Sequence, residues 1–258
     1  MSRLPLVLVA TAVCLQSQTA VHPRYPAAPS RLLSRDPLAL VRAILGGEVR
    51  VRNAAMNEVF DFRVPLEDGT LKPDLTVNAV QLDEDSEFEF VMTVHVGPPG
   101  LSAVVIVDRG ADGWRANGNS GYRWHWDPNT AEQVVELHPP FVMVRETGGG
   151  TGIWSTDATL FRLWRGRLYK TFAVTEGREA TRYGTDPLET VLETAKLTIS
   201  QHEIGVRTEK TSLFTDGNGK QVRKPLTKSE CKAYRWNLPT LTFEPDAKVT
   251  EVLCRSSR

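Results

Sequence analysis

Three stretches typical of β-strands follow one another in the first half of the chain: Leu75-Thr76-Val77-Asn78-Ala79-Val80-Gln81-Leu82, Phe88-Glu89-Phe90-Val91-Met92-Thr93-Val94-His95-Val96, and Leu101-Ser102-Ala103-Val104-Val105-Ile106-Val107. The first two alternate apolar and polar residues, whereas the third is nearly continuously apolar, as expected of a strand buried on both faces. Turn residues follow the second and third stretches, at 98–100 and 109–113. The sequence therefore predicts a meander of adjacent antiparallel strands.

The same pattern recurs twice farther along the chain. A second round predicts a strand over 136–144, a glycine-rich turn over 148–152, and a hairpin of strands 158–164 and 168–174. A third round predicts strands over 195–199, 205–214, 233–236 and 240–243, with a turn at 216–219. Asp186-Pro187 predicts a short helix through Glu193. The expected fold is mainly β, with repeated antiparallel meanders arranged as a sandwich or in a propeller-like manner.

The first twenty residues have the layout of a secretory signal peptide. Arg3 precedes an apolar run from Leu4 to Leu15, and small residues follow up to Ala20. Acylation at Cys14 is an alternative, but Val13 is a poor residue to precede a lipid-carrying cysteine. An uncleaved membrane anchor is a further alternative. We therefore expect a protein that is exported to the periplasm or secreted, with no membrane span in its mature chain.

A linker and one helix are expected before the strands. Residues 21–35 are rich in Pro, Ala, Ser and Arg, which predicts an extended linker. Ser34 or Asp36 can cap a helix that begins at Pro37 and ends at Gly46-Gly47, with Leu38, Val41, Ile44 and Leu45 on one face. A short strand is expected over 58–64. Residues 36–258 are predicted to form a single β-rich domain with this one N-terminal helix.

Composition excludes some partners and predicts a disulfide. The 258 residues include 31 basic and 31 acidic side chains, and the basic residues are scattered, so no field favours nucleic acid. If the signal peptide is removed, Cys231 and Cys254 are the remaining cysteines. In an oxidising compartment this pair predicts a disulfide, with two buried free thiols as the alternative.

An acidic segment, Asp83-Glu84-Asp85-Ser86-Glu87-Phe88-Glu89, is the first candidate site. In a tight turn, Asp83, Asp85 and Glu87 could converge on one hard cation such as Ca²⁺. In an extended strand entry, these side chains and Glu89 would lie on one solvated face instead. The sequence favours the solvated face because no glycine permits the sharp loop of an EF-hand-like site.

The same segment carries a family resemblance. Leu82-Asp83-Glu84-Asp85-Ser86-Glu87-Phe88-Glu89-Phe90-Val91, followed by a hairpin, resembles the blade unit of FG-GAP or VCBS-type β-propeller repeats over residues 74–176. The resemblance implies an acidic loop that leads into a strand and can bind calcium. The layout is also similar to that of secreted bacterial β-rich proteins.

The second candidate site is Tyr122-Arg123-Trp124-His125-Trp126-Asp127. On a strand, Trp124 and Trp126 would face one way and His125 the other. Exposed indoles could stack on a sugar ring or on an apolar anchor of a partner, whereas buried indoles would cap the core, which is the commoner arrangement for Trp. We expect any ligand-binding surface to include Trp124, His125, Trp126 and Asp127.

No catalytic set is evident in the sequence. Gly118-Asn119-Ser120-Gly121 lacks convincing His and Asp partners, residues 148–152 lack the Lys-Ser/Thr of a phosphate loop, and the five histidines show no metal-ligand spacing. The leading hypothesis is a non-enzymatic binding protein whose partner is an envelope protein or a glycan. The alternatives are a hydrolase that uses a carboxylate pair assembled by the fold, and a structural envelope component.

Overall fold

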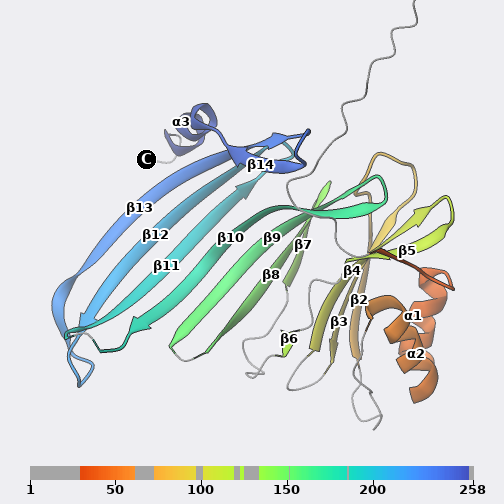
Figure 1. Ribbon diagram of the computed structural model, residues 1–258, viewed down its shortest axis with the longest axis horizontal. Coiled ribbons are helices and arrows are strands. Elements are labelled where there is room, and N and C mark those ends of the chain that lie inside the picture. Colours follow the sequence, from red (N-terminus) through yellow and green to blue (C-terminus); the bar gives the residue numbers. More distant parts are fainter. Residues whose placement is uncertain are drawn as a thin grey trace, which may run out of the picture.

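The computed structural model describes residues 30–61, 73–96, 101–118, 123–124, 134–150, 152–184 and 186–255. The expected signal peptide and residues 21–29 of the expected linker lie outside these ranges. The described chain is mainly β, as predicted, and its strands form two antiparallel sheets (Figure 1). No ring of four-stranded blades occurs among the described strands, so nothing in them corresponds to the propeller-like alternative.

The first sheet has six strands in the order β1-β5-β4-β3-β2, and β6 also pairs with β4. Their bounds are β1 (Ser30–Leu32), β2 (Pro73–Val80), β3 (Glu89–Val96), β4 (Leu101–Gly110), β5 (Gly113–Asn117) and β6 (Arg123–Trp124). Residues 103–108 of β4 are all buried, which confirms the prediction of a strand covered on both faces. β1 lies in the segment expected to be a linker, and it pairs with β5.

Two helices, α1 (Pro37–Gly46) and α2 (Val49–Phe60), cover one face of this sheet (Figure 1). Apolar residues at helical spacing on both helices pack against alternate residues of β3 and β4. This core includes Leu40, Ile44, Met56, Phe60, Met92, Val94, Val105 and Val107. The burial of these side chains from water is the main force that holds the helices on the sheet.

The first helix agrees with the sequence prediction, and the second does not. Asp36 caps α1, because its carboxylate accepts a hydrogen bond from the Ala39 amide at 2.9 Å. The strand expected over 58–64 is wrong for its described residues, since Glu58 to Phe60 belong to α2. The described residues before β2 therefore contain two helices where one was expected.

Glu58 joins α2 to the segment before α1. Its carboxylate accepts hydrogen bonds from the Ser34 amide at 2.5 Å and the Ser34 hydroxyl at 2.7 Å, and it pairs with Arg35 at 3.1 Å. Burial opposes ionisation, but these hydrogen bonds and the guanidinium outweigh it and lower the pKa of Glu58 below its ordinary value. Ser34, the alternative candidate for the α1 cap, therefore hydrogen-bonds to Glu58, and Asp36 caps the helix.

We expect Glu58→Gln to lower the free energy of unfolding by about 1 kcal/mol at neutral pH, because partly exposed charge-assisted hydrogen bonds are weakened. A lowered pKa means that this stabilisation is present above the unfolded-state pKa of about 4.5 and is lost as the pH falls through the folded-state pKa. The free energy of unfolding, measured with urea from about pH 7 down to pH 3, should therefore fall less in the variant than in the wild type. Glu48→Gln, at the α2 N-cap without a side-chain capping bond, is the control and should follow the wild type.

The second sheet is an eight-stranded meander in the order β14-β13-β12-β11-β10-β9-β8-β7. Its strands are β7 (Val134–His138), β8 (Phe141–Gly150), β9 (Ile153–Trp164), β10 (Arg167–Arg182), β11 (Leu188–Ile199), β12 (Glu203–Thr215), β13 (Gln221–Asn237) and β14 (Thr242–Pro245). The predicted hairpin over 158–174 is confirmed, with a two-residue turn at Arg165-Gly166 in which both residues have positive φ. Positive φ at both positions is the geometry of a type I′ turn.

Three details of this sheet differ from the sequence prediction. The strand expected over 136–144 is two strands, because Pro139-Pro140 form a turn between β7 and β8. Residues 148–150 extend β8, so the predicted glycine-rich turn is shorter than expected. The helix expected from Asp186 to Glu193 is wrong, since residues from Leu188 onward belong to β11 and pair with both β10 and β12.

The two sheets pack face to face through a second apolar core. Leu82, Val91, Val104 and Ile106 of the first sheet and its β2–β3 connection meet Val142, Val144, Leu163 and Leu168 of the second. Alternation along β3 and β4 places Glu89 and Asp108 on the same faces as Val91 and Ile106. Both carboxylates therefore point toward the junction of the two sheets.

The second sheet is strongly curved, and its long strands extend away from this junction (Figure 1). Near the junction, aromatic residues of β8, β13 and β14 close a third core around Phe141, Trp236 and Phe243. Toward the far end, ten successive residues of β13, 221–230, are exposed. Because successive strand residues face opposite sides, neither face of the sheet is covered along this part of β13.

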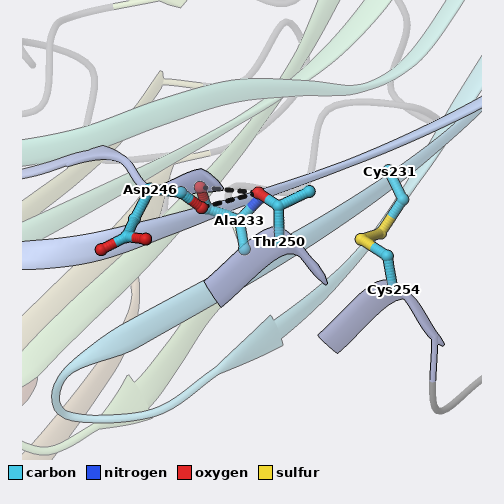
Figure 2. The surroundings of a disulfide bond; sticks show 5 residues. All are labelled: Cys231, Ala233, Asp246, Thr250 and Cys254. Atoms are coloured by element: carbon cyan, nitrogen blue, oxygen red, sulfur yellow. Dashed lines mark hydrogen bonds between the residues drawn. A yellow bond between two sulfur atoms is a disulfide. The ribbon is translucent and has the colours of Figure 1, made fainter. Parts of the chain in front are cut away.

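A third helix, α3 (Ala247–Arg255), lies against β13 and β12. The predicted disulfide between Cys231 and Cys254 is present and joins this helix to β13, with Cα atoms 5.9 Å apart (Figure 2). In the same region, the Ala233 amide donates to the Thr250 hydroxyl at 2.8 Å, and that hydroxyl donates to the Asp246 carbonyl at 2.8 Å. None of the helices in the described ranges is long and apolar enough to cross a membrane.

We expect Cys254→Ser to lower the free energy of unfolding by about 3 kcal/mol, because the disulfide restricts the unfolded chain over a loop with a sequence separation of 23. Urea unfolding with and without dithiothreitol measures this loss. Reduced wild type should match the variant, and the variant should not respond to the reductant. A variant as stable as the oxidised wild type would contradict a stabilising role of the bond.

Candidate metal centre

The connection from β2 to β3 is a tightly bent loop and not an extended strand entry. The Asp83 carboxylate accepts from the Asp85 amide at 2.9 Å, and the Asp85 carboxylate accepts from the Glu87 amide at 2.8 Å. The Gln81 side-chain amide donates to the carbonyls of Asp83 and Asp85, at 3.3 and 2.6 Å. These bonds hold the bend without the glycine that the sequence argument required.

This bend brings four carboxylates together. One oxygen from each of Asp83, Asp85, Glu89 and Asp108 lies within 4.8 Å of the others. Glu89 begins β3 and Asp108 lies near the end of β4, where the register of Phe90 with Val107 makes them cross-strand neighbours. Their exposed fractions are 1% and 4%, whereas Asp85 is exposed. We call these four residues the carboxylate cluster.

Glu89 is the residue that distinguishes this cluster from an ordinary acidic surface. One of its carboxylate oxygens accepts a hydrogen bond from the Leu82 amide, and the other is buried with no hydrogen-bond partner among the residues that the structure describes. Burial, followed by repulsion from Asp83 and Asp108, raises the pKa of Glu89 to about 7. A buried carboxylate oxygen without a partner is costly unless something positive compensates it.

The pKa values of two other members are raised for related reasons. Burial raises the pKa of Asp83, and repulsion from the neighbouring Asp85 adds to this effect. Burial likewise raises the pKa of Asp108, with a further contribution from the charge of Asp83. The cluster is therefore a concentration of acidic groups, and none of its four members takes part in an ion pair within the described ranges.

The geometry suits a hard divalent cation. Calcium takes carboxylate oxygens at 2.3–2.6 Å, so two ligands on opposite sides of the ion are about 5 Å apart. The separations within the carboxylate cluster lie inside this limit. Carbonyl oxygens and water molecules can complete the 6–8 ligands that calcium prefers.

The structure brings together only part of the predicted metal set. Asp83 and Asp85 belong to the carboxylate cluster, but Glu87 does not, because its carboxylate pairs with Arg109 at 3.2 Å outside the cluster. Glu89 and Asp108 take part instead. The signal that could have revealed Asp108 is an acidic residue at the end of the apolar run 101–107.

Two pockets adjoin the carboxylate cluster. Asp85 lines a pocket of about 550 Å³ together with Glu87, Arg109 and the β4–β5 turn. Asp108 lines another of about 500 Å³ on the side of the β9–β10 turn. A cation could therefore reach the buried carboxylates from solvent past Asp85.

The tryptophan-rich candidate site lies largely outside the described residues. His125, Trp126 and Asp127 are not described, and Trp124 is described only as part of β6, where it pairs with Leu101. The role of this tryptophan-rich segment in ligand binding therefore stays a prediction. Among the described histidines, His138 contacts Glu136 at 3.2 Å, and none belongs to the carboxylate cluster.

Comparisons with protein-family models, with curated proteins and with solved structures find no match to this chain. Fold and site therefore define the protein only by class: two packed antiparallel sheets with a cluster of carboxylates at their junction.

Proposed function

We propose that this chain is an exported, non-enzymatic binding module that holds a divalent cation in the carboxylate cluster. Calcium is the cation that the cluster suits best. The observation that carries the proposal is the buried, unpartnered oxygen of Glu89 among three further carboxylates. Four carboxylates within this distance repel one another, and a bound cation would turn that repulsion into attraction.

Four further observations support the proposal. The signal-peptide pattern of residues 1–20 and the Cys231–Cys254 disulfide both suit an oxidising compartment. The resemblance of the loop from Leu82 to Val91 to FG-GAP and VCBS-type repeats also favours calcium. The pockets beside Asp85 and Asp108 favour a binding role over a purely structural one.

Thermal unfolding of the mature protein in calcium and in EDTA tests this proposal. A cation that binds only the folded state raises the melting temperature by mass action. Calcium should raise it, EDTA should reverse the rise, and isothermal titration calorimetry should give one site per chain. A melting temperature that is the same in both conditions, with no heat of binding, would refute the proposal.

A hydrolase is the second candidate function, and one observation favours it. Glu89 has a pKa raised to about 7 and lies opposite Asp108, which lines a pocket. A protonated acid beside a second carboxylate is the pairing of a general acid with a base or nucleophile. Hydrolysis of chromogenic glycosides that Glu89→Gln abolishes would favour this enzyme over the binding module.

A further inference from the structure

Three arginines line the pocket of about 500 Å³ beside Asp108. Arg115 comes from β5 of the first sheet, whereas Arg165 lies in the β9–β10 turn of the second sheet and Arg167 is the first residue of β10. Ser30, Gly110 and Gly166 complete the lining. We call this space the arginine pocket, and its walls come from both sheets.

The positive charge in the arginine pocket is only partly compensated. Arg115 makes a two-pronged contact with Asp112, in which Nε lies 3.1 Å from the carboxylate. Within the described part of the chain, Arg165 and Arg167 make no ion pair, and the Arg165 guanidinium lies 5.8 Å from the centre of the Trp164 ring. Ser30 lines the same pocket, and its hydroxyl is buried with no hydrogen-bond partner among the described residues. Arg165 and Arg167 therefore line this pocket without a carboxylate partner in the described ranges.

Guanidinium groups are planar and can donate two parallel hydrogen bonds to the oxygens of a carboxylate or a phosphate. The number of arginines in this pocket indicates which of these two ligand groups it would bind. Two uncompensated arginines beside a third suit a dianion with several acceptor oxygens better than a single carboxylate. The volume is larger than one inorganic phosphate needs and falls in the range of small-molecule sites. A phosphate monoester fits these properties.

The arginine pocket and the carboxylate cluster share Asp108. The turn that carries Arg165 lies against this residue, because a Cβ placed on Gly166 would be 3.7 Å from an Asp108 carboxylate oxygen. An anion in the pocket is therefore repelled by the carboxylate cluster when that cluster is empty. A divalent cation would cancel two of those charges and could itself contact an anion oxygen.

We propose that the arginine pocket binds a phosphate monoester, and that a cation in the carboxylate cluster strengthens this binding. The inference rests on the proposed function for its cation dependence. By linkage, the phosphate strengthens cation binding by the same factor. The phosphate group could belong to a soluble metabolite or to a lipid headgroup, since both present the same oxygens.

Calorimetric titration of the full mature protein with glycerol 3-phosphate, in calcium and in EDTA, tests the inference. We expect binding in calcium and an affinity lower by about tenfold in EDTA, within the usual range of coupling between sites. Arg167→Gln should weaken phosphate binding by about tenfold or more. Arg167→Lys should retain only part of the wild-type affinity, because lysine keeps the charge but cannot donate the two parallel hydrogen bonds of a guanidinium group. Arg178→Gln, on β10 away from the pocket, is the matched control and should bind normally.

The outcomes separate this inference from the proposed function. Calcium binding without any phosphate binding, or phosphate binding unchanged in Arg167→Gln, would overturn the arginine pocket alone. Equal phosphate affinity in calcium and in EDTA would overturn the coupling. Sedimentation with phosphatidic acid vesicles tests the lipid source, and competition of that binding by glycerol 3-phosphate would support the same pocket. Absence of binding to both probes in calcium would overturn the inference for both sources.

Discussion

Glu89→Gln should abolish the stabilisation of this protein by calcium and should make the metal-free protein more stable at about pH 8. Glutamine keeps the shape of the side chain and an oxygen that can accept the Leu82 amide hydrogen, but it carries no charge for a cation. In the wild type, a calcium concentration a thousandfold above the dissociation constant should add about 4 kcal/mol. For a domain of this size that gain corresponds to a rise in melting temperature of roughly 10 °C, which the variant should lack.

The effect in EDTA follows from the sign of the pKa shift. The pKa of Glu89 is raised from 4.5 to about 7 in the folded state, so folding favours the protonated form. The unfolded state loses its proton first as the pH rises, and the free energy of unfolding of the wild type therefore falls between about pH 4.5 and pH 7. Above pH 7 the loss amounts to at most about 3 kcal/mol. Removal of the charge in Glu89→Gln removes this loss.

Differential scanning calorimetry in EDTA across about pH 5 to pH 8, and then in calcium, measures both effects in one variant. The stability difference between variant and wild type should shrink as the pH is lowered toward 5. Glu87→Gln is the control, because this carboxylate lies in the same loop but pairs with Arg109. It should keep the calcium response. A Glu89→Gln protein that calcium stabilises as much as the wild type would contradict the assignment of the carboxylate cluster.

Half of the carboxylate cluster could be predicted from the sequence, and the other half depends on the fold. Asp83 and Asp85 stand in one acidic segment and form the bend through local hydrogen bonds between their side chains and nearby amides. Glu89 and Asp108 meet only because β3 pairs with β4 in a particular register. Glu87 was a candidate ligand by its spacing, beside the favoured solvated face, and its carboxylate pairs with Arg109 instead of joining the cluster. Residue spacing alone does not determine which side of a bent loop a side chain occupies.

The same division between local and long-range information holds for the fold. The start of α1 was predictable because its cap, Asp36, and its first residue, Pro37, act locally. α2 was missed, and a strand was expected over 58–64 instead, because Val49 and Val51 are exposed and the helix is held by Met56 and Phe60 against the first sheet. The first half of β11, up to Glu193, was mistaken for a helix because Asp186-Pro187 resembles a helix start, whereas the strand over 195–199 was predicted; pairing with β10 and β12 decides the conformation of the whole strand. Tertiary contacts override local preference in both cases.

The second large expected effect concerns the curvature of the second sheet. Phe141 on β8 is fully buried, and its ring centre lies 5.5 Å from that of Trp236 on β13 and 5.2 Å from that of Phe243 on β14. The Arg162 guanidinium lies 5.7 Å from the centre of the same ring. These contacts join strands that are far apart in the order of the sheet, so Phe141 holds the curved part of the meander closed.

Phe141→Ala should therefore lower the free energy of unfolding by about 3–5 kcal/mol, the usual cost of removing a buried aromatic ring from a packed core. Phe214→Ala is the matched control, because this ring is only half-buried where β12 pairs with the exposed part of β13, and it lies 5.7 Å from the Arg223 guanidinium. The Phe214→Ala variant should lose only about 1 kcal/mol of the free energy of unfolding. Urea unfolding of both variants measures the difference, and Phe141→Leu, with an expected loss of about 1 kcal/mol, replaces Phe141→Ala if that variant does not fold.

The two substitutions should also affect amide hydrogen exchange in different parts of the second sheet. Few apolar contacts cover residues 221–230 of β13, so their amides should exchange with solvent through local opening at a low free energy. Amides next to Phe141 should exchange only on global unfolding, and Phe141→Ala should accelerate them by the factor that matches its loss of stability. Phe214→Ala should change exchange only in the uncovered part of the sheet. Equal losses of stability in the two variants would show that the aromatic core does not hold the curved sheet together.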